Sequence, residues 1–348
     1  MPPIKQASTE ACYHLPHSYT TIALCDPTLF FLLSSSAIFL IHMALCLSMA
    51  SSFLAFLPLA YLIHHDYRSF LSLGPGGTPS TFTGYLKITY LRIYTLSDPF
   101  IPPPLSEETT IPATGYFQQT QTTLPIRDGQ RPTVAGIAPQ RQRDSFSPLN
   151  IYLRLRRTWI SSAASYPESL KTAKSCFEKQ GLALFAEENS RVNETCRGEI
   201  AHVHAIDGSF HMSLHPSDCA EILIKGWGQR HPLAGRGPGV VLGQLGRKMR
   251  RYARWFECKG RDGEGRAIVP SGFVLVYAPR NNRELEVVGR IVGAAAWWVM
   301  GREIEFRYGC AKEVDLETLK MEAGVKEDDR VPGDVHNASA RCHGGCMR

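Results

Sequence analysis

The chain has 348 residues, of which 44% are hydrophobic, and this is enough for one or two domains with a buried core. Its net charge of +6 is mild and no long Lys/Arg block is present, so no nucleic-acid partner is expected. The 10 cysteines are too sparse for a disulfide scaffold. The CHGGC motif at residues 342–346 resembles half of a zinc knuckle, but no second half is nearby, which favours a tail over a metal site.

The N-terminal part of the chain contains a long apolar run. Residues 1–27 are polar and irregular, whereas residues 28–63 contain no Asp, Glu, Lys or Arg. As one helix this run would be about 54 Å long, well beyond a hydrocarbon core of ~30 Å. It therefore predicts a transmembrane anchor, either one span from Met43 to Ile63 or two spans in a hairpin, with the lipid bilayer as a partner.

The charges around the apolar run bear on topology. Lys and Arg are slightly more frequent after the run than before it, which predicts a main domain in the cytosol, anchored to the endoplasmic reticulum or another internal membrane. Two sequons, at Asn193 and Asn337, favour the lumen instead. Residues 64–148 are predicted to be a loop-rich, membrane-proximal segment, with a short helix or strand at residues 85–96.

The clearest local signal lies around Asp207-Gly208. This pair separates two runs that alternate polar and apolar residues, which predicts a β-hairpin with a two-residue turn. Such a turn pairs His204 with His211, and His202 with Ser213. Side chains alternate faces along a strand. We therefore expect a core face made of Ala201, Val203, Phe210, Met212 and Leu214, and a polar face made of His202, His204, His211 and His215.

The segments around the hairpin complete the predicted domain. Residues 149–160 have helical spacing, residues 169–185 are weakly patterned, and residues 227–235 read as a loop. A helix capped by Ser217, a strand at residues 272–277 and a helix begun by Asn281 follow the hairpin. We predict an α+β domain over residues 149–299, with helices on one face of a small antiparallel or mixed sheet. A Gly/Arg-rich insertion at about residues 236–271 interrupts it, and residues 300–348 are predicted to be a disordered tail.

Several of these motifs resemble the fungal luciferase family, the membrane-anchored proteins of bioluminescent mushrooms and their many non-luminous relatives. The resemblance extends from about His64 to Trp298. It is strongest in EIAHVH at residues 199–204, GWGQRHPLAG at residues 226–235 and YAPRN at residues 277–281, with short matches at residues 65–71, 74–75, 84–85, 131–132 and 140–142.

The resemblance implies an activity. In that family O₂ is thought to add to an α-pyrone of the 3-hydroxyhispidin type, and the peroxide then loses CO₂ without a metal or flavin. The resemblance therefore implies an oxygenase of a small planar pyrone or phenolic metabolite, with no cofactor beyond O₂. Because most members of the family are not known to emit light, light emission is not expected here.

Cofactor-free oxygenation requires a base, groups that hold an enolate, and a dry pocket. Histidine is suited to the first role. The candidate catalytic residues are His202, His204, His211 and His231, with His204 favoured because the predicted register places it against His211. Arg230 and Arg280 are candidates for holding an enolate or carboxylate. Trp227 is a candidate for stacking on a flat ring, and Asn281 completes the predicted substrate-binding set. Each of these residues also has a structural alternative, such as Trp227 in the core or Arg280 fixing the loop before its helix.

Two further hypotheses remain open. His202, His204 and His211 could form a three-nitrogen set for a divalent metal, with Asp207 or Glu199 supporting the ligands. The domain could also be a non-catalytic module that binds a small planar metabolite.

Overall fold

The computed structural model describes residues 27–45, 48–104, 112–193, 195–237, 267–306 and 308. Several predictions fall outside these ranges: the polar segment before residue 27, most of the insertion at residues 236–271, the CHGGC motif, the sequon at Asn337 and the tail beyond residue 308.

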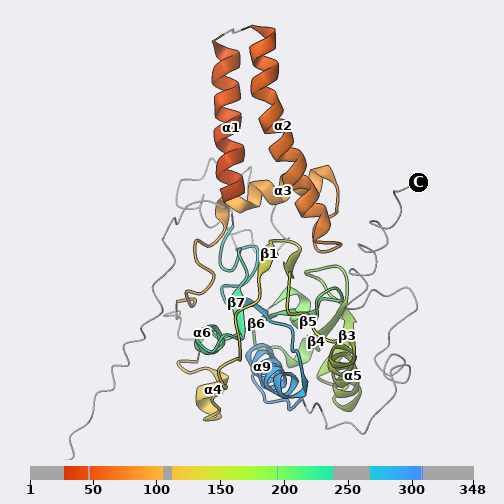
Figure 1. The fold of residues 1–348 in the computed structure, drawn as a ribbon. Coiled ribbons are helices and arrows are strands. Elements are labelled where there is room, and N and C mark those ends of the chain that lie inside the picture. Colours follow the sequence, from red (N-terminus) through yellow and green to blue (C-terminus); the bar gives the residue numbers. More distant parts are fainter. Residues whose placement is uncertain are drawn as a thin grey trace, which may run out of the picture.

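The described residues form an α+β fold around an antiparallel sheet (Figure 1). The main sheet has 6 strands in the order β3-β4-β5-β6-β8-β7. Their bounds are β3 Leu170–Lys174, β4 Leu182–Ala186, β5 Glu199–Val203, β6 Phe210–Ser213, β8 Phe273–Val276 and β7 Gly228–Arg230. A separate ribbon pairs β1 (Val134–Gly136) with β2 (Gln140–Gln142).

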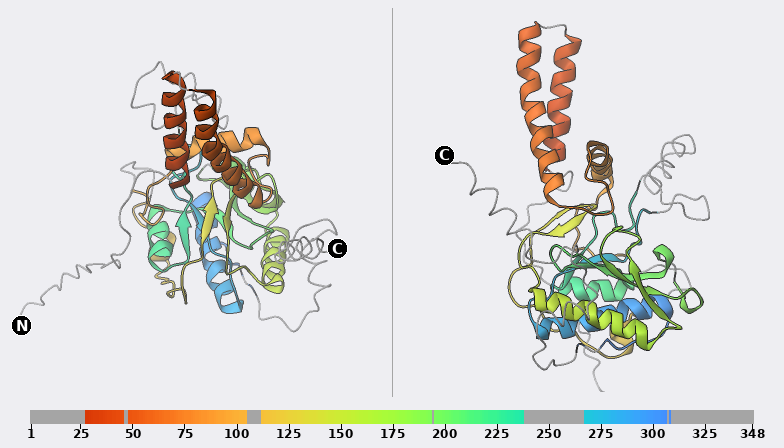
Figure 2. Two further views of the ribbon diagram at one scale, coloured as in Figure 1. Left: turned by 45° about the horizontal axis from the view of Figure 1, so that its top comes forward. Right: turned by 90° about the vertical axis from the view of Figure 1, so that its right-hand side faces the viewer.

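Two long helices cover one face of the main sheet, as Figure 2 shows from the side. They are α5 (Leu149–Ser165) and α9 (Asn282–Met300). The Asn281 side chain accepts a hydrogen bond from the Glu284 amide at 3.0 Å, so it begins α9 as predicted. The expected hairpin residues Ala201, Val203, Phe210, Met212 and Leu214 all lie in the core beneath these helices. The predicted α+β architecture, with helices on one face, is therefore present.

The opposite face of the sheet is covered by segments from the N-terminal half. A second apolar cluster joins Phe70 at the end of α2 (Met49–Ser72) and Tyr85 of α3 (Phe82–Leu91) to Phe273 of β8. Asp66 of α2 accepts hydrogen bonds from both terminal nitrogens of Arg92, at 2.6 and 3.0 Å. Four short helical elements and α6 complete the fold: η1 Arg92–Tyr94, α4 Tyr116–Gln119, η2 Glu188–Ser190, η3 Cys196–Gly198 and α6 Pro216–Ile224.

The predicted transmembrane anchor at residues 28–63 is wrong. Across the described ranges, no helix combines the length and the apolar character needed to cross a membrane. The apolar run is divided between α1 (Pro27–Ala44) and α2, which pack side by side and project from the body (Figure 1). The 18 residues of α1 measure about 27 Å, slightly less than a hydrocarbon core. The 24 residues of α2 continue into His64, Asp66 and Arg68. The finding also contradicts the predicted membrane localisation.

The hairpin has a different register from the predicted one. His202 is paired with His211 and Val203 with Phe210, and the His204 amide donates to the Ser209 carbonyl at 2.8 Å. The connection is therefore longer than the two-residue turn at Asp207-Gly208. The shift is by two residues, so it changes the pairing but leaves the side chains within β5 and β6 on their predicted faces.

Several shorter elements also differ from their predictions. The weakly patterned residues 169–185 contain β3 and most of β4, and the expected loop at residues 227–235 contains the edge strand β7. The N-cap of α6 is His215 rather than Ser217, because the His215 side chain accepts from the Ser217 amide. The helix predicted at residues 149–160 continues to Ser165.

Candidate functional site

Three histidines of the hairpin converge on the face opposite α5 and α9. The ring centroids of His202 and His211 lie 5.3 Å apart, those of His204 and His211 4.9 Å, and those of His202 and His204 5.4 Å. All three side chains are buried. The alternation of β5 and β6 therefore brings these imidazoles together, as the sequence predicted.

Each of the three rings is held through Nδ1. His202 Nδ1 lies 2.6 Å from Glu199 Oε1, and His211 Nδ1 lies 3.1 Å from the Val274 carbonyl. His204 Nδ1 lies 2.9 Å from Ser209 Oγ, whose own hydroxyl donates to Asp207 Oδ1 at 2.7 Å. The Nε2 atoms of these rings consequently face the middle of the cluster.

A carboxylate from the β3–β4 loop approaches these Nε2 atoms. Glu178 Oε2 lies 3.5 Å from His204 Nε2 and 3.7 Å from His202 Nε2. Arg141 binds the other oxygen, Oε1. Within the described part of the chain Oε2 has no hydrogen-bond partner, although it is buried. Burying an oxygen without a hydrogen bond costs free energy, so Glu178 Oε2 is a candidate functional group of this site.

The loop that carries Glu178 is held in place by hydrogen bonds to Glu199 and by a disulfide. Glu199 accepts from Ser175 Oγ at 2.9 Å and from the Cys176 amide at 2.7 Å. Ser175 Oγ in turn accepts from the Glu178 amide at 3.0 Å. A disulfide joins Cys176 to Cys196, just before β5. Glu199 therefore orients both His202 and the loop of Glu178.

His231 completes the ring cluster but has a different environment. Its ring centroid lies 5.3 Å from that of His211. Nε2 lies 2.8 Å from the Ile137 carbonyl, and Nδ1 accepts from the Leu233 amide at 3.1 Å. Both nitrogens are occupied by backbone groups, so neither is available to a substrate or a metal.

Burial sets the protonation of the cluster. It lowers the pKa of His204. It also lowers the pKa of His211 well below its ordinary value, and the neighbouring imidazoles of His204 and His202 lower that pKa further. Burial also lowers the pKa of His231 to about 4. These three rings are therefore neutral at pH 7. Burial alone would raise the pKa of Asp207, but its contacts with His204 and Arg141 leave it below the ordinary value.

The cluster lines a cavity of about 180 Å³. Phe177 and Phe273 form one wall, with ring centroids 4.8 Å apart, and Phe273 stacks on His211 at an interplanar angle of 12°. Ile137 and Leu233 form much of the remaining apolar lining. An apolar cavity of about 150 Å³ can hold benzene, so this one has room for roughly one aromatic ring.

The predicted substrate-binding residues lie elsewhere. Trp227 is in the core under α9, where its Nε1 donates to the Pro125 carbonyl at 2.7 Å. Arg230 donates to the carbonyls of Ser271 and Ala234, and Arg280 binds Glu284. Asn281 caps α9. The cavity is lined by His202, His204, His211 and His231. Its lining does not include Trp227, Arg230, Arg280 or Asn281.

His215 also leaves the predicted histidine face. Its Nε2 lies 2.9 Å from the Pro112 carbonyl and its ring packs against Trp298 of α9. Strand β6 ends at Ser213, so the period of two that assigned His215 to that face no longer applies.

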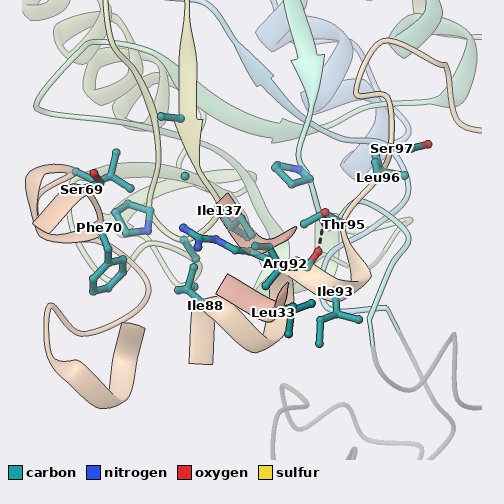
Figure 3. A pocket seen from close by; sticks show the side chains of 17 residues that line it. Leu33, Ser69, Phe70, Ile88, Arg92, Ile93, Thr95, Leu96, Ser97 and Ile137 are labelled. Carbon is teal, nitrogen blue, oxygen red and sulfur yellow. Dashed lines mark hydrogen bonds between the residues drawn. The ribbon is translucent and has the colours of Figure 1, made fainter. Parts of the chain in front are cut away.

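A larger cavity of about 980 Å³ lies at the base of the α1–α2 hairpin (Figure 3). Leu33, Phe70, Ile88 and Ile137 are among its lining residues, and its ionisable lining residue, Arg92, is bound to Asp66. Ile137, Ala138 and Pro139 line both cavities, so the two share a wall. The groups able to take up a proton or bind a metal are nevertheless in the smaller cavity.

Comparison with known proteins identifies the family of the chain. The family model described as the Luciferase domain matches residues 197–295, which include all four histidines of the cavity. The chain is 31% identical over 248 residues to a luciferase of Armillaria mellea, and the match covers 67% of this chain and 80% of that protein. It is 28% identical over 249 residues to a luciferase of Neonothopanus nambi, with the same two coverages. No solved structure matches the chain. On these similarities, the chain belongs to the fungal luciferase family.

Proposed function

We propose that the chain is an oxygenase that adds O₂ to a hydroxylated α-pyrone or related phenolic ring in the histidine-lined cavity. The observation that carries the proposal is the convergence of the Nε2 atoms of His202 and His204 with the buried, unpartnered Oε2 of Glu178, in a cavity the size of one ring. The luciferases that the chain resembles support the reaction class.

Glu178 is assigned as the proton acceptor. A ring hydroxyl placed among the imidazoles would lie within reach of Oε2, the one oxygen of that carboxylate that Arg141 does not bind. Loss of the proton makes the ring an electron-rich enolate, which forms a carbon–oxygen bond with O₂. The peroxide then loses CO₂. Substrate and O₂ give product and CO₂, so the reaction requires no external reductant.

The apolar wall has a second role in this proposal. Phe177 and Phe273 would pack against the flat ring and exclude water from the peroxide. His231 stays neutral and bonded to the backbone on both sides, so it shapes the cavity without exchanging protons.

The test is to incubate the full chain with 3-hydroxyhispidin and O₂, following oxygen uptake, CO₂ release and photons together. We expect equimolar oxygen uptake and CO₂ release. Glu178→Gln keeps the shape of the side chain but removes its basicity, so it should reduce turnover by about 10²- to 10⁴-fold with little change in substrate affinity. The control is Glu187→Gln, which alters a partly exposed carboxylate paired with Lys171.

Two outcomes would contradict the proposal. Substrate binding without oxygen uptake by the wild-type chain would identify a binding module instead of an enzyme. Full turnover by Glu178→Gln would show that another group accepts the proton.

A further inference from the structure

The hydrogen-bond pattern fixes which nitrogen of each clustered imidazole carries a hydrogen. His202 Nδ1 faces a carboxylate oxygen and His211 Nδ1 faces a carbonyl oxygen. Both partners only accept, so both rings must donate from Nδ1. Ser209 gives its hydroxyl hydrogen to Asp207, so His204 must also donate from Nδ1. In the neutral ring the other nitrogen, Nε2, then carries a lone pair.

The centre of the cluster therefore brings together atoms that can only accept hydrogen bonds: the Nε2 atoms of the neutral rings and Oε2 of Glu178. One ligand atom from each of His202, His204 and His211 can be chosen so that all three lie within 4.8 Å of one another. The unpartnered Glu178 Oε2 lies 3.5 and 3.7 Å from two of the Nε2 atoms. Two acceptor atoms cannot hydrogen-bond to each other, so atoms this close are stabilised by a cation or a hydrogen-bond donor placed between them.

The buried charges lead to the same requirement. Three carboxylates, Glu178, Glu199 and Asp207, are buried around the imidazoles. The buried cation beside them is Arg141, which pairs with Glu178, so buried carboxylates outnumber buried guanidinium groups around the rings. Lys87 and Lys179 also line this cavity, but both are exposed. A divalent cation would neutralise the remaining charge where solvent does not reach.

We propose that His202, His204 and His211 bind a divalent transition-metal ion through their Nε2 atoms. Imidazole suits ions such as zinc, iron, copper and nickel, and three protein ligands leave coordination positions for a substrate. Metal–nitrogen bonds of about 2.0–2.1 Å require the rings to move inward by roughly 1 Å. Histidines that bind metals ordinarily donate from their other ring nitrogen to a carboxylate or carbonyl, which Glu199 and Val274 provide here, and which Asp207 provides for His204 through the Ser209 hydroxyl.

The metal site deepens the proposed function without changing the role of Glu178. A ring hydroxyl bound to the ion loses its proton more readily, because the ion stabilises the anion. Glu178 Oε2, beside the ligand nitrogens, is placed to accept that proton. The role of Glu178 as proton acceptor rests on the proposed oxygenase reaction, whereas metal binding by the three histidines requires no substrate.

The experiment measures metal binding in the absence of substrate. The full chain is treated with a chelator, dialysed and titrated with Co²⁺, following the visible absorption of the bound ion and the metal content per chain. We expect one Co²⁺ per chain, with Mg²⁺ unable to compete. His211→Gln should lower the Co²⁺ affinity by more than about 100-fold, and Glu199→Gln by about 10- to 100-fold.

Two controls separate lost ligands from lost folding. His215→Asn changes a buried histidine of the same segment that faces α9, and asparagine can still cap α6, so Co²⁺ binding should be unchanged. Glu178→Gln should keep the metal but lose turnover. Far-ultraviolet circular dichroism confirms that each variant is folded. A folded wild-type chain that binds no Co²⁺, or a His211→Gln variant that binds it as tightly as the wild type, would overturn the site.

The two proposals fail in different ways. Turnover of 3-hydroxyhispidin at an unchanged rate by chelated, metal-free protein would remove the metal from the mechanism and leave the oxygenase assignment intact. Stoichiometric Co²⁺ binding without oxygen uptake from any hydroxypyrone would leave the metal site and remove the oxygenase assignment.

Discussion

His231 differs from its three neighbours at the scale of single atoms, because the backbone bonds to both of its ring nitrogens. The Ile137 carbonyl accepts a hydrogen bond from Nε2–H, and the Leu233 amide donates one to Nδ1. A second proton on this ring would point at an N–H group. The depressed pKa of His231, about 4, agrees with that geometry. The ring is thus a neutral structural element within the histidine cluster.

The pKa of His231 predicts how its contribution to stability depends on pH. The unfolded side chain titrates near 6.5 and the folded one near 4, so the folded state disfavours the proton. The contribution is complete above pH 6.5 and is lost as the pH falls towards 4, by about 3 kcal/mol in total.

Glutamine at position 231 can keep the donor to Ile137 but cannot titrate. His231→Gln should therefore flatten the fall in unfolding free energy between pH 6.5 and 4, measured by urea titration of the metal-free protein at several pH values. An equally steep fall in the variant would assign the acid sensitivity to other groups.

Single residues of the site were predictable to different degrees. His202, His204 and His211 were placed together from alternation alone, since a strand sends every second side chain to one face. Glu178 lies on a loop whose path depends on Glu199 and on the pairing of β4 with β5. No local pattern marks such a residue. Trp227 and Arg230 carry the strongest family motif, yet they stabilise the fold away from the cavity.

At the scale of elements, the hairpin loop depends on Asp207. Its Oδ1 accepts from the Ser209 amide at 2.8 Å and from the Ser209 hydroxyl at 2.7 Å, and its Oδ2 accepts from the Gln142 amide at 2.8 Å. These bonds close the loop upon itself and tie it to β2. They also hold the hydroxyl that orients His204.

Asp207→Ala removes all three bonds from a fully buried site. We expect a loss of at least about 3 kcal/mol in unfolding free energy, because hydrogen bonds to charged groups contribute most when buried. Denaturant titration measures the loss. Asp98→Ala is the matched control, since Asp98 also accepts from an amide two residues ahead, but it is only partly buried and its hydrogen bond is exposed. Equal losses in the two variants would show that the loop does not depend on Asp207.

The elements also show where sequence patterns are sufficient. Helix α9 was predictable from its N-cap and its apolar spacing, which are both local. The hairpin register was not, because a type I′ turn requires a positive φ at both central residues, whereas Gly208 has one and Asp207, bonded to Ser209 and Gln142, does not. Strand β7 is short and lies at the sheet edge, so its pairing with β8 leaves little periodicity in the chain.

At the scale of the whole molecule, the α1–α2 hairpin is joined to the body by a buried ion pair. Asp66 of α2 and Arg92 of η1 lie on segments that both pack against the second apolar cluster. The apolar run of residues 28–63 suggested a membrane span because hydropathy records composition alone. The start of α2 is marked locally by the N-cap Ser48, whereas the packing of the end of α2 on the body depends on residues far along the chain.

Breaking this ion pair should destabilise the protein. Asp66→Asn removes the buried carboxylate that binds both terminal nitrogens of the partly buried Arg92, at a cost of up to about 3–5 kcal/mol. Lys171→Gln provides the comparison, because its pair with Glu187 is exposed and its loss should cost less than about 1 kcal/mol. Thermal unfolding of both variants measures the difference. Similar costs would mean that the Asp66–Arg92 pair is screened by solvent.

The wall shared by the two cavities has a consequence for which molecules fit. The cavity for one ring and the wider, apolar cavity share a wall formed by Ile137, Ala138 and Pro139. His231 fixes this wall by its hydrogen bond to the Ile137 carbonyl. A metabolite with a long styryl arm can occupy both compartments only if this short stretch gives way. Discrimination by substituent length would then reside in a three-residue gate tied to a histidine that performs no chemistry.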